Sequence, residues 1–171
     1  MVTQSPLEIL RSVPILSTVP ESDLVALAQA SRERSYPAGQ VILRQDAPGD
    51  AMYVVIEGRV KVVLIGEDGR EVILSVLGPG AVFGEMALLD DAPRSAHVIA
   101  MTQCHVMTLY RGAFHERLRA SPDLCLAMLA ALSSRLRLAD ERIRALSLLD
   151  VNGRVAHLLL QQSAEAGSDT F

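Results

Sequence analysis

The chain has 171 residues, half of them apolar, and a formal net charge of −4. This length and composition predict one folded domain, or one domain plus a fragment, and exclude a disordered chain. Because the charge makes it a poor nucleic-acid binder by itself and no signal peptide or membrane-length apolar run is present, we expect a cytoplasmic protein with no membrane partner.

Two helices are predicted in the first segment, residues 1–33. Ser5-Pro6-Leu7-Glu8 is typical of a helix start, because serine can cap, proline fits the first turn and Glu8 completes a capping box. A second amphipathic helix is predicted over Glu21–Ala30.

Short strands are predicted in the second segment, residues 34–110. Turn sequences such as Pro48-Gly49-Asp50 and Gly78-Pro79-Gly80 separate the apolar runs. Many short strands at this spacing argue for an all-β sandwich or barrel. The predicted strands cover residues 41–43, 52–56, 60–65, 72–77, 96–101 and 104–109.

The third segment, residues 111–149, is predicted to be helical. Ser121-Pro122-Asp123 caps a long helix that runs to about Leu149. Apolar residues three and four apart form an a/d seam, which favours pairing with a second copy of the chain. The alternative is a helix lying on its own barrel. The seam consists of Leu129, Leu132, Leu136, Ala139, Ile143 and Leu146.

The stretch FGEMALLDDAPRSAHV, from Phe83 to Val98, interrupts the strands with one helical turn. Gly84 permits close backbone approach, and the first N–H groups of the turn favour an anion. Arg94 can bind two phosphate oxygens, and Glu85 can accept a bond from a nearby hydroxyl. A phosphate beside a free hydroxyl suggests a 3′,5′-cyclic nucleotide. In the alternative interpretation, Arg94 pairs with Asp90 or Asp91 and Glu85 is solvated.

The same stretch resembles the phosphate-binding cassette of cyclic nucleotide-binding domains. Phe83-Gly84-Glu85, Ala87-Leu88-Leu89 and Pro93-Arg94-Ser95-Ala96 match its pattern. The resemblance implies a mainly β fold with flanking helices, in which a double-stranded β-helix (jelly-roll) barrel is followed by a long dimerisation helix.

Residues 148–156 resemble the hinge of bacterial Crp/Fnr-type transcription regulators, with Asp150 as the hinge residue. In that family the hinge joins the dimer helix to a winged helix-turn-helix domain. The resemblance therefore implies that residues 150–171 are the hinge and the first helix of a truncated DNA-binding domain, with a short helix over about 151–162.

The resemblance also assigns roles to individual residues. It implies that four residues hold the ribose and cyclic phosphate, namely Gly84, Glu85, Arg94 and Ser95. Val62, Leu74 and Met86 form an apolar wall, or else belong to the core. Arg135 reaches toward the phosphate or is solvated. Ala139 and Asp140 stand where the cyclic-AMP-responsive type has Thr-Ser reading the base, so Asp140 selects the base or pairs with Arg142 or Arg144.

The resulting hypothesis is the sensing and dimerisation portion of a transcription regulator, with no cofactor and with cyclic AMP as its favoured allosteric ligand. Cyclic GMP, a cyclic dinucleotide or a ligand-free dimerisation module are the alternatives. DNA and RNA polymerase are expected as partners only of the full-length protein. The sequence shows neither the N-terminal cysteine cluster of an iron–sulfur sensor nor a pattern of haem ligands. A remote alternative is a cupin-like metal enzyme, for which His97 and His105 show no HxH motif; we expect no enzyme and no metal.

Overall fold

The computed structural model describes residues 5–148 and Gly153, apart from the side chains of Ile15, Arg142 and Leu146. The chain divides into two compact units, Met1–Ala127 and Met128–Phe171. The predicted hinge residue Asp150 and the predicted helix over 151–162 fall outside the described residues, apart from Gly153. Neither prediction is tested.

The first unit begins with helices α1 (Pro6–Ser12), η1 (Pro14–Leu16) and α2 (Glu21–Ala30). The predicted capping box is present. The Ser5 Oγ accepts a 3.3 Å bond from the Glu8 N–H, and the Ser5 N–H donates a 2.7 Å bond to the Glu8 carboxylate. Both predicted N-terminal helices are confirmed. The short 3₁₀ turn between them was not predicted.

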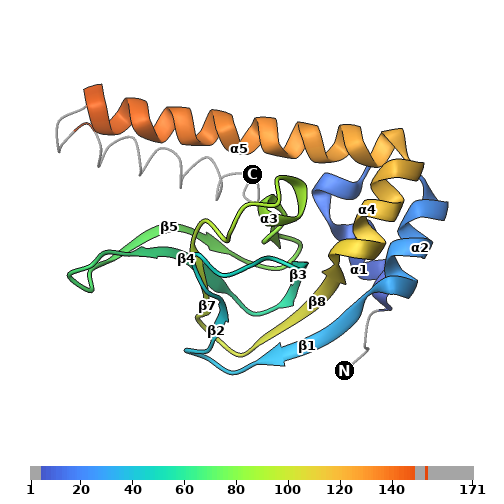
Figure 1. Ribbon diagram of the computed structural model, residues 1–171, viewed down its shortest axis with the longest axis horizontal. Coiled ribbons are helices and arrows are strands. Elements are labelled where there is room, and N and C mark those ends of the chain that lie inside the picture. The colour runs from blue at the N-terminus through green and yellow to red at the C-terminus, as the bar shows by residue number, and fades with distance from the viewer. Residues whose placement is uncertain (1–4, 149–152, 154–171) are drawn as a thin grey trace, which may run out of the picture. The chain divides into compact units, whose positions relative to one another are not determined.

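In the part of the chain that the structure describes, eight strands form two antiparallel sheets of four. Figure 1 shows how these strands are arranged. One sheet has the order β1-β8-β3-β6 and the other β2-β7-β4-β5. The predicted mainly β fold with flanking helices is confirmed. The strands are β1 (Arg32–Tyr36), β2 (Val41–Leu43), β3 (Ala51–Glu57), β4 (Val60–Ile65), β5 (Glu71–Leu77), β6 (Val82–Phe83), β7 (His97–Ala100) and β8 (Cys104–Tyr110).

The core of the barrel lies between the two sheets. Every second residue of β3 and β8 points into this core. Tyr53 and Val106, for example, pack in one cluster with Val60 and Val98 of the other sheet. Tyr53 stacks on Phe83 of β6 with ring centroids 5.1 Å apart. Every residue from Ala51 to Val55 is buried, which indicates that both faces of β3 are covered.

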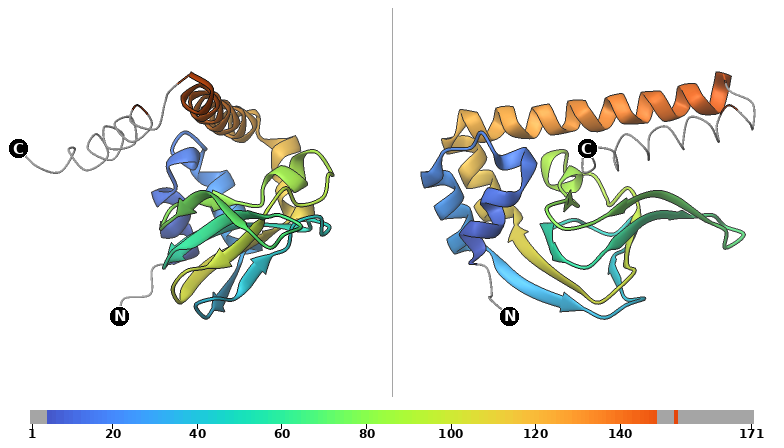
Figure 2. Two further views of the ribbon diagram at one scale, coloured as in Figure 1. Left: turned by 90° about the vertical axis from the view of Figure 1, so that its left-hand side faces the viewer. Right: turned by 180° about the vertical axis from the view of Figure 1, so that it is seen from behind.

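Helices cover the outer face of the β1-β8-β3-β6 sheet. Met52 and Val54 of β3 line a small apolar cavity together with helical residues such as Leu27 and Phe114. Phe114 lies on α4 (Arg111–Ala120), which follows β8 directly. The side views in Figure 2 show α1, α2 and α4 gathered at this side of the sheet. The helical layer is therefore built from helices that precede the first strand and a helix that follows the last one.

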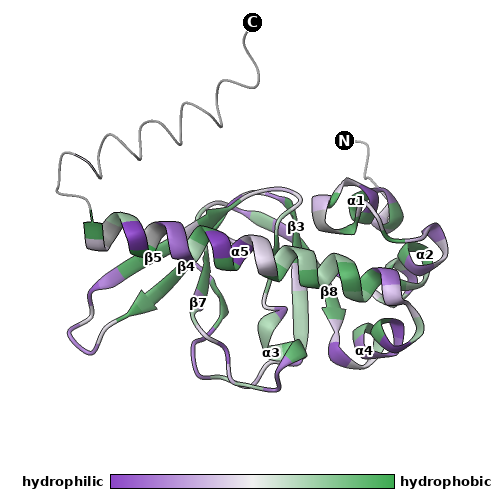
Figure 3. Cartoon of the chain, turned by 90° about the horizontal axis from the view of Figure 1, so that it is seen from above, coloured by the Kyte–Doolittle hydropathy of each residue, from purple (hydrophilic) through white to green (hydrophobic). Residues whose placement is uncertain are grey.

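The long helix α5 (Pro122–Leu148) starts in the first unit and continues into the second. Figure 3 shows apolar positions recurring along it. The predicted seam residues Leu129, Leu136 and Ile143 are exposed, Ala139 is exposed and Leu132 is half-buried. Among the described residues, no helix has the length and apolarity needed to cross a membrane.

Candidate functional site

The segment from Phe83 to Arg94 is a tight excursion between β6 and β7. Gly84 has φ +79°, which turns the chain into the four-residue helix α3 (Met86–Leu89). Asp90 closes the helix and accepts a 3.0 Å bond from the Ala92 N–H, and Asp91 follows with φ +57°. This left-handed residue returns the chain toward the barrel, as an aspartate can do at low cost.

Arg94 is the central cation of this excursion and is only 4% exposed. Its Nη1 donates a 2.5 Å bond to the Gly84 carbonyl, and its Nη2 donates a 2.6 Å bond to the Ala51 carbonyl. Its own backbone N–H donates to the Ala47 carbonyl at 2.9 Å. The side chain and the backbone of Arg94 are therefore both fixed.

The Arg94 guanidinium keeps donors for a ligand. A guanidinium has five N–H donors, and two are engaged by carbonyls. Its Nε is buried and has no partner among the described residues. A buried cation with open donors in a fixed plane is suited to binding an oxyanion at two points.

The groups around Arg94 offset part of the effect of its burial. Burial lowers the pKa of the Arg94 guanidinium below its ordinary value, while the nearby Tyr53, Asp50 and Glu85 act in the opposite direction. Glu85 is itself only 2% exposed. A carboxylate and a guanidinium thus lie close together within the first unit, where one can accept a bond from a hydroxyl and the other can hold an anion.

The alternative interpretation of the sequence, in which Arg94 pairs with an aspartate and Glu85 is solvated, is wrong. Asp91 forms an ion pair with Arg111, and Asp90 accepts from Ala92. Glu85 is buried. The acidic insert shapes the loop and leaves Arg94 to the backbone carbonyls.

The other predicted ligand residues of the first unit are less buried than Glu85 and Arg94. Val62 is half-buried and packs against the barrel core. Leu74 and Met86 are exposed, as is Ser95, the neighbour of Arg94. A wall formed by the apolar residues stays a prediction. Gly84, Glu85 and Arg94 are the three predicted residues that the structure brings together.

Three predicted residues lie on α5 in the second unit. Arg135, Ala139 and Asp140 are all exposed there. Their assigned roles toward the phosphate and the base stay predictions.

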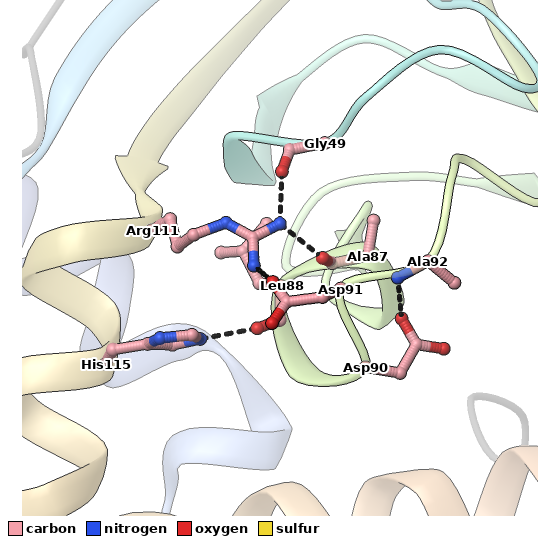
Figure 4. Close-up of polar contacts among 8 residues, drawn as sticks. All are labelled: Gly49, Ala87, Leu88, Asp90, Asp91, Ala92, Arg111 and His115. Atoms are coloured by element: carbon pink, nitrogen blue, oxygen red, sulfur yellow. Dashed lines mark hydrogen bonds and ion pairs between the residues drawn. The ribbon is translucent and has the colours of Figure 1, made fainter.

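Sequence reasoning missed three residues around this site. Gly49 was interpreted only as part of a turn, yet it lies against Arg94. Arg111 of α4 donates to the carbonyls of Gly49 and Ala87, and His115 of α4 donates to the Leu88 carbonyl of the excursion, as Figure 4 shows. One signal was available for Arg111. A cation at the first position of a helix opposes the helix dipole, so such a residue needs another reason to be there.

Metal chemistry has no cluster to support it in the part of the chain that the structure describes. No group of three or more His, Cys, Asp or Glu side chains there could hold an ion. Cys104 is buried and its thiol donates to the carbonyls of Arg59 and Thr102. Cys125 donates to the Leu118 carbonyl at 3.1 Å. Both thiols thus have backbone partners.

Comparison with known proteins shows consistent similarities. A family model described as the cyclic nucleotide-binding domain matches residues 33–121. A "CRP-like cAMP-activated global transcriptional regulator" of Mycobacterium tuberculosis is 32% identical over 161 residues, covering 94% of this chain and 72% of that protein.

Solved structures agree with these matches. The catabolite activator protein of Thermus thermophilus has a TM-score of 0.70 at 34% identity, covering 78% of this chain and 63% of that one. The sensor domain of the transcriptional regulator DNR from Pseudomonas aeruginosa has a TM-score of 0.68 at 27% identity, covering 84% of this chain and 95% of that one.

Proposed function

The chain belongs to the cyclic nucleotide-binding domain family and, within it, to the Crp/Fnr transcription regulators. From this premise we propose that Arg94 holds the cyclic phosphate of a regulatory ligand and that Glu85 holds its ribose. The observation that carries this proposal is the buried Arg94, fixed by two carbonyls with its Nε open, beside the buried Glu85. Ser95 and Gly84 complete the assignment by resemblance.

Cyclic AMP is the favoured ligand because it is named for the mycobacterial relative. The Pseudomonas relative is known as a sensor domain, with no nucleotide in its name, so cyclic GMP, a cyclic dinucleotide and a ligand-free module are the competing proposals. Base selection is assigned to Asp140, with Ala139 unable to hydrogen-bond a base. This is a binding and signalling role, without catalysis.

Control of DNA binding is the proposed output. A ligand changes activity only if it binds one state of the protein better than another. We assign dimerisation to the α5 seam, and contacts with DNA and RNA polymerase to the full-length protein in the cytoplasm. The relatives of the same family are transcription regulators by name, which supports this output.

Calorimetric titration with cyclic AMP, cyclic GMP and a cyclic dinucleotide tests the phosphate site. We expect one ligand to bind the wild-type chain. Arg94→Ala should weaken it by about 2–5 kcal/mol, because one partner of a buried charged contact is removed. Thermal unfolding followed by circular dichroism checks that the variant still folds.

The matched control is Arg70→Ala. Arg70 lies in the β4–β5 turn, where its exposed side chain pairs with Asp68. The Arg70→Ala variant should bind the cyclic nucleotide as tightly as the wild type does. Equal affinity of folded Arg94→Ala and wild type would rule out Arg94 as the phosphate ligand, and no heat with any of the three nucleotides would favour the ligand-free module.

A further inference from the structure

We propose that Arg111 and His115 are positioning residues that brace the cassette from α4 and so hold Arg94 in its anion-binding place. The proposal rests on the proposed function of Arg94. It assigns a role to two α4 side chains that touch no part of the assigned ligand site directly.

Arg111 joins three parts of the cassette and its surroundings. Its Nη2 donates to the Gly49 carbonyl at 2.5 Å and to the Ala87 carbonyl at 2.6 Å. Its Nη1 forms an ion pair with Asp91, and its backbone N–H donates to the Asp50 carbonyl at 2.8 Å. One residue thus ties the β2–β3 loop, the helix α3 and the acidic insert to the start of α4.

The two carbonyls that share Nη2 belong to residues packed at Arg94. A Cβ placed on Gly49 would lie 2.4 Å from the Ala87 Cβ and 2.9 Å from the Arg94 Cζ. The loop, α3 and the Arg94 guanidinium therefore meet at Gly49 without spare room. Because Arg111 holds the Gly49 and Ala87 carbonyls together, we expect it to fix the surface against which Arg94 lies.

His115 adds a second attachment one helical turn further along α4. Its Nε2 lies 2.5 Å from the Leu88 carbonyl (Figure 4). A carbonyl can only accept, so Nε2 carries the hydrogen. Both the neutral Nε2–H form and the imidazolium can donate this bond, so the brace does not depend on the charge of His115.

The helix α3 needs this support. It has four residues, too few to be stable through its own hydrogen bonds. Ala87 and Leu88 are among its last residues, whose carbonyls have no partner within the helix. Arg111 and His115 satisfy these carbonyls with cationic or polar donors, as basic side chains do at helix C-termini. The contact also explains a cation at the N-terminus of α4, where the helix dipole disfavours it.

Amide hydrogen exchange on the ligand-free chain tests the brace without any ligand. The amides of Leu88, Leu89 and Asp90 are bonded within α3. Arg111→Ala should speed exchange in peptides covering residues 84–95 by about tenfold, because the local opening free energy falls. His115→Ala should act in the same direction, and His115→Gln, which keeps an N–H donor, should restore part of the protection.

Arg117→Ala is the matched control. Arg117 lies on the same helix, has the same 29% side-chain exposure as Arg111 and also pairs with a carboxylate, that of Glu116. Its exchange should match the wild type. Asp91→Asn removes the ion pair alone, and because the Asp91 carboxylate is exposed it should speed exchange less than Arg111→Ala does.

Titration of the same variants with the cyclic nucleotide that binds the wild type gives the second readout. Arg111→Ala should weaken binding by about tenfold, and Arg117→Ala should not. Unchanged amide exchange in Arg111→Ala overturns the proposal. If the wild type binds a cyclic nucleotide, an unchanged affinity of Arg111→Ala for it overturns the proposal too. A wild type that binds no nucleotide overturns the function proposed for Arg94, while faster exchange in Arg111→Ala would still establish the brace on the cassette.

Discussion

Gly49 and Gly84 approach the Arg94 guanidinium from two different loops. A Cβ on Gly84 would lie 2.8 Å from the Arg94 Nη1 and 3.1 Å from the Leu43 Cδ1, and a Cβ on Gly49 would lie equally close to the guanidinium. Both glycines leave the space that the buried cation occupies. The backbone carbonyl of Gly84 then accepts from the same guanidinium. The lack of side chains at these two positions is thus what lets the Arg94 guanidinium fit between the two loops.

Gly84→Ala should lose both stability and ligand affinity. Its φ of +79° costs an L-residue about 1–2 kcal/mol, and the new methyl group also displaces Arg94 or Leu43. Gly69→Ala is the control, because Gly69 has a φ of +77° with no atom within 4 Å of its added Cβ. Urea unfolding and calorimetric titration measure the two effects.

The difference between the two variants isolates the contact with Arg94. Gly69→Ala should show the backbone strain alone and bind ligand as the wild type does. Equal losses of stability together with equal affinities in the two variants would show that the space beside Arg94 does not matter.

Secondary-structure elements were predictable where their residues carry a local signal. The capping box at Ser5 and the Ser121-Pro122-Asp123 start of α5 were both identified correctly. The strand β1 was missed because Arg32–Tyr36 is mostly polar and exposed, so no alternation marks it. It forms only because β8 lies beside it. A two-residue strand such as β6 is likewise defined by its partner.

The corner between α4 and α5 depends on one serine. The Ser121 Oγ accepts a 3.2 Å bond from the Leu124 N–H, and Ser121 is buried. Leu124 is fully buried too, so this cap fixes the point within the first unit where the long helix begins.

Ser121→Ala should lower the free energy of unfolding by about 1 kcal/mol, because the Leu124 N–H loses its capping partner. Ser133→Ala is the control, since Ser133 lies exposed inside α5 and alanine is the better helix former. Urea unfolding of both variants checks the prediction. A loss at Ser133 as large as the loss at Ser121 would assign the effect to the substitution type and not to the cap.

At the scale of the whole molecule, the phosphate site and the seam belong to different units. Arg94, Glu85 and their described partners lie within Met1–Ala127, and most of α5 lies in Met128–Phe171. The sequence predicted the cassette because its residues are contiguous. It did not predict the brace, because Arg111 and His115 lie far along the chain from the carbonyls that they bind. Such a contact follows from how β8 leads into α4, which no local pattern encodes.

The exposed apolar seam of α5 predicts a dimer. Leu136 and Ile143 are 63% and 61% exposed, and residues seven apart on one helix face are suited to pairing with a second helix. Leu136→Glu or Ile143→Glu should produce monomers, because a buried carboxylate in the seam has no partner. Sedimentation velocity over a range of protein concentrations measures the association.

Leu148→Glu distinguishes the seam from general loss of apolar surface. Leu148 is 74% exposed, but five residues after Ile143 it lies off the a/d seam. It should therefore remain dimeric, although it removes more exposed apolar surface than either seam variant. Equal dissociation of all three variants would mean that α5 associates through non-specific apolar contact, and a monomeric wild type at all concentrations would remove the seam from the proposed mechanism.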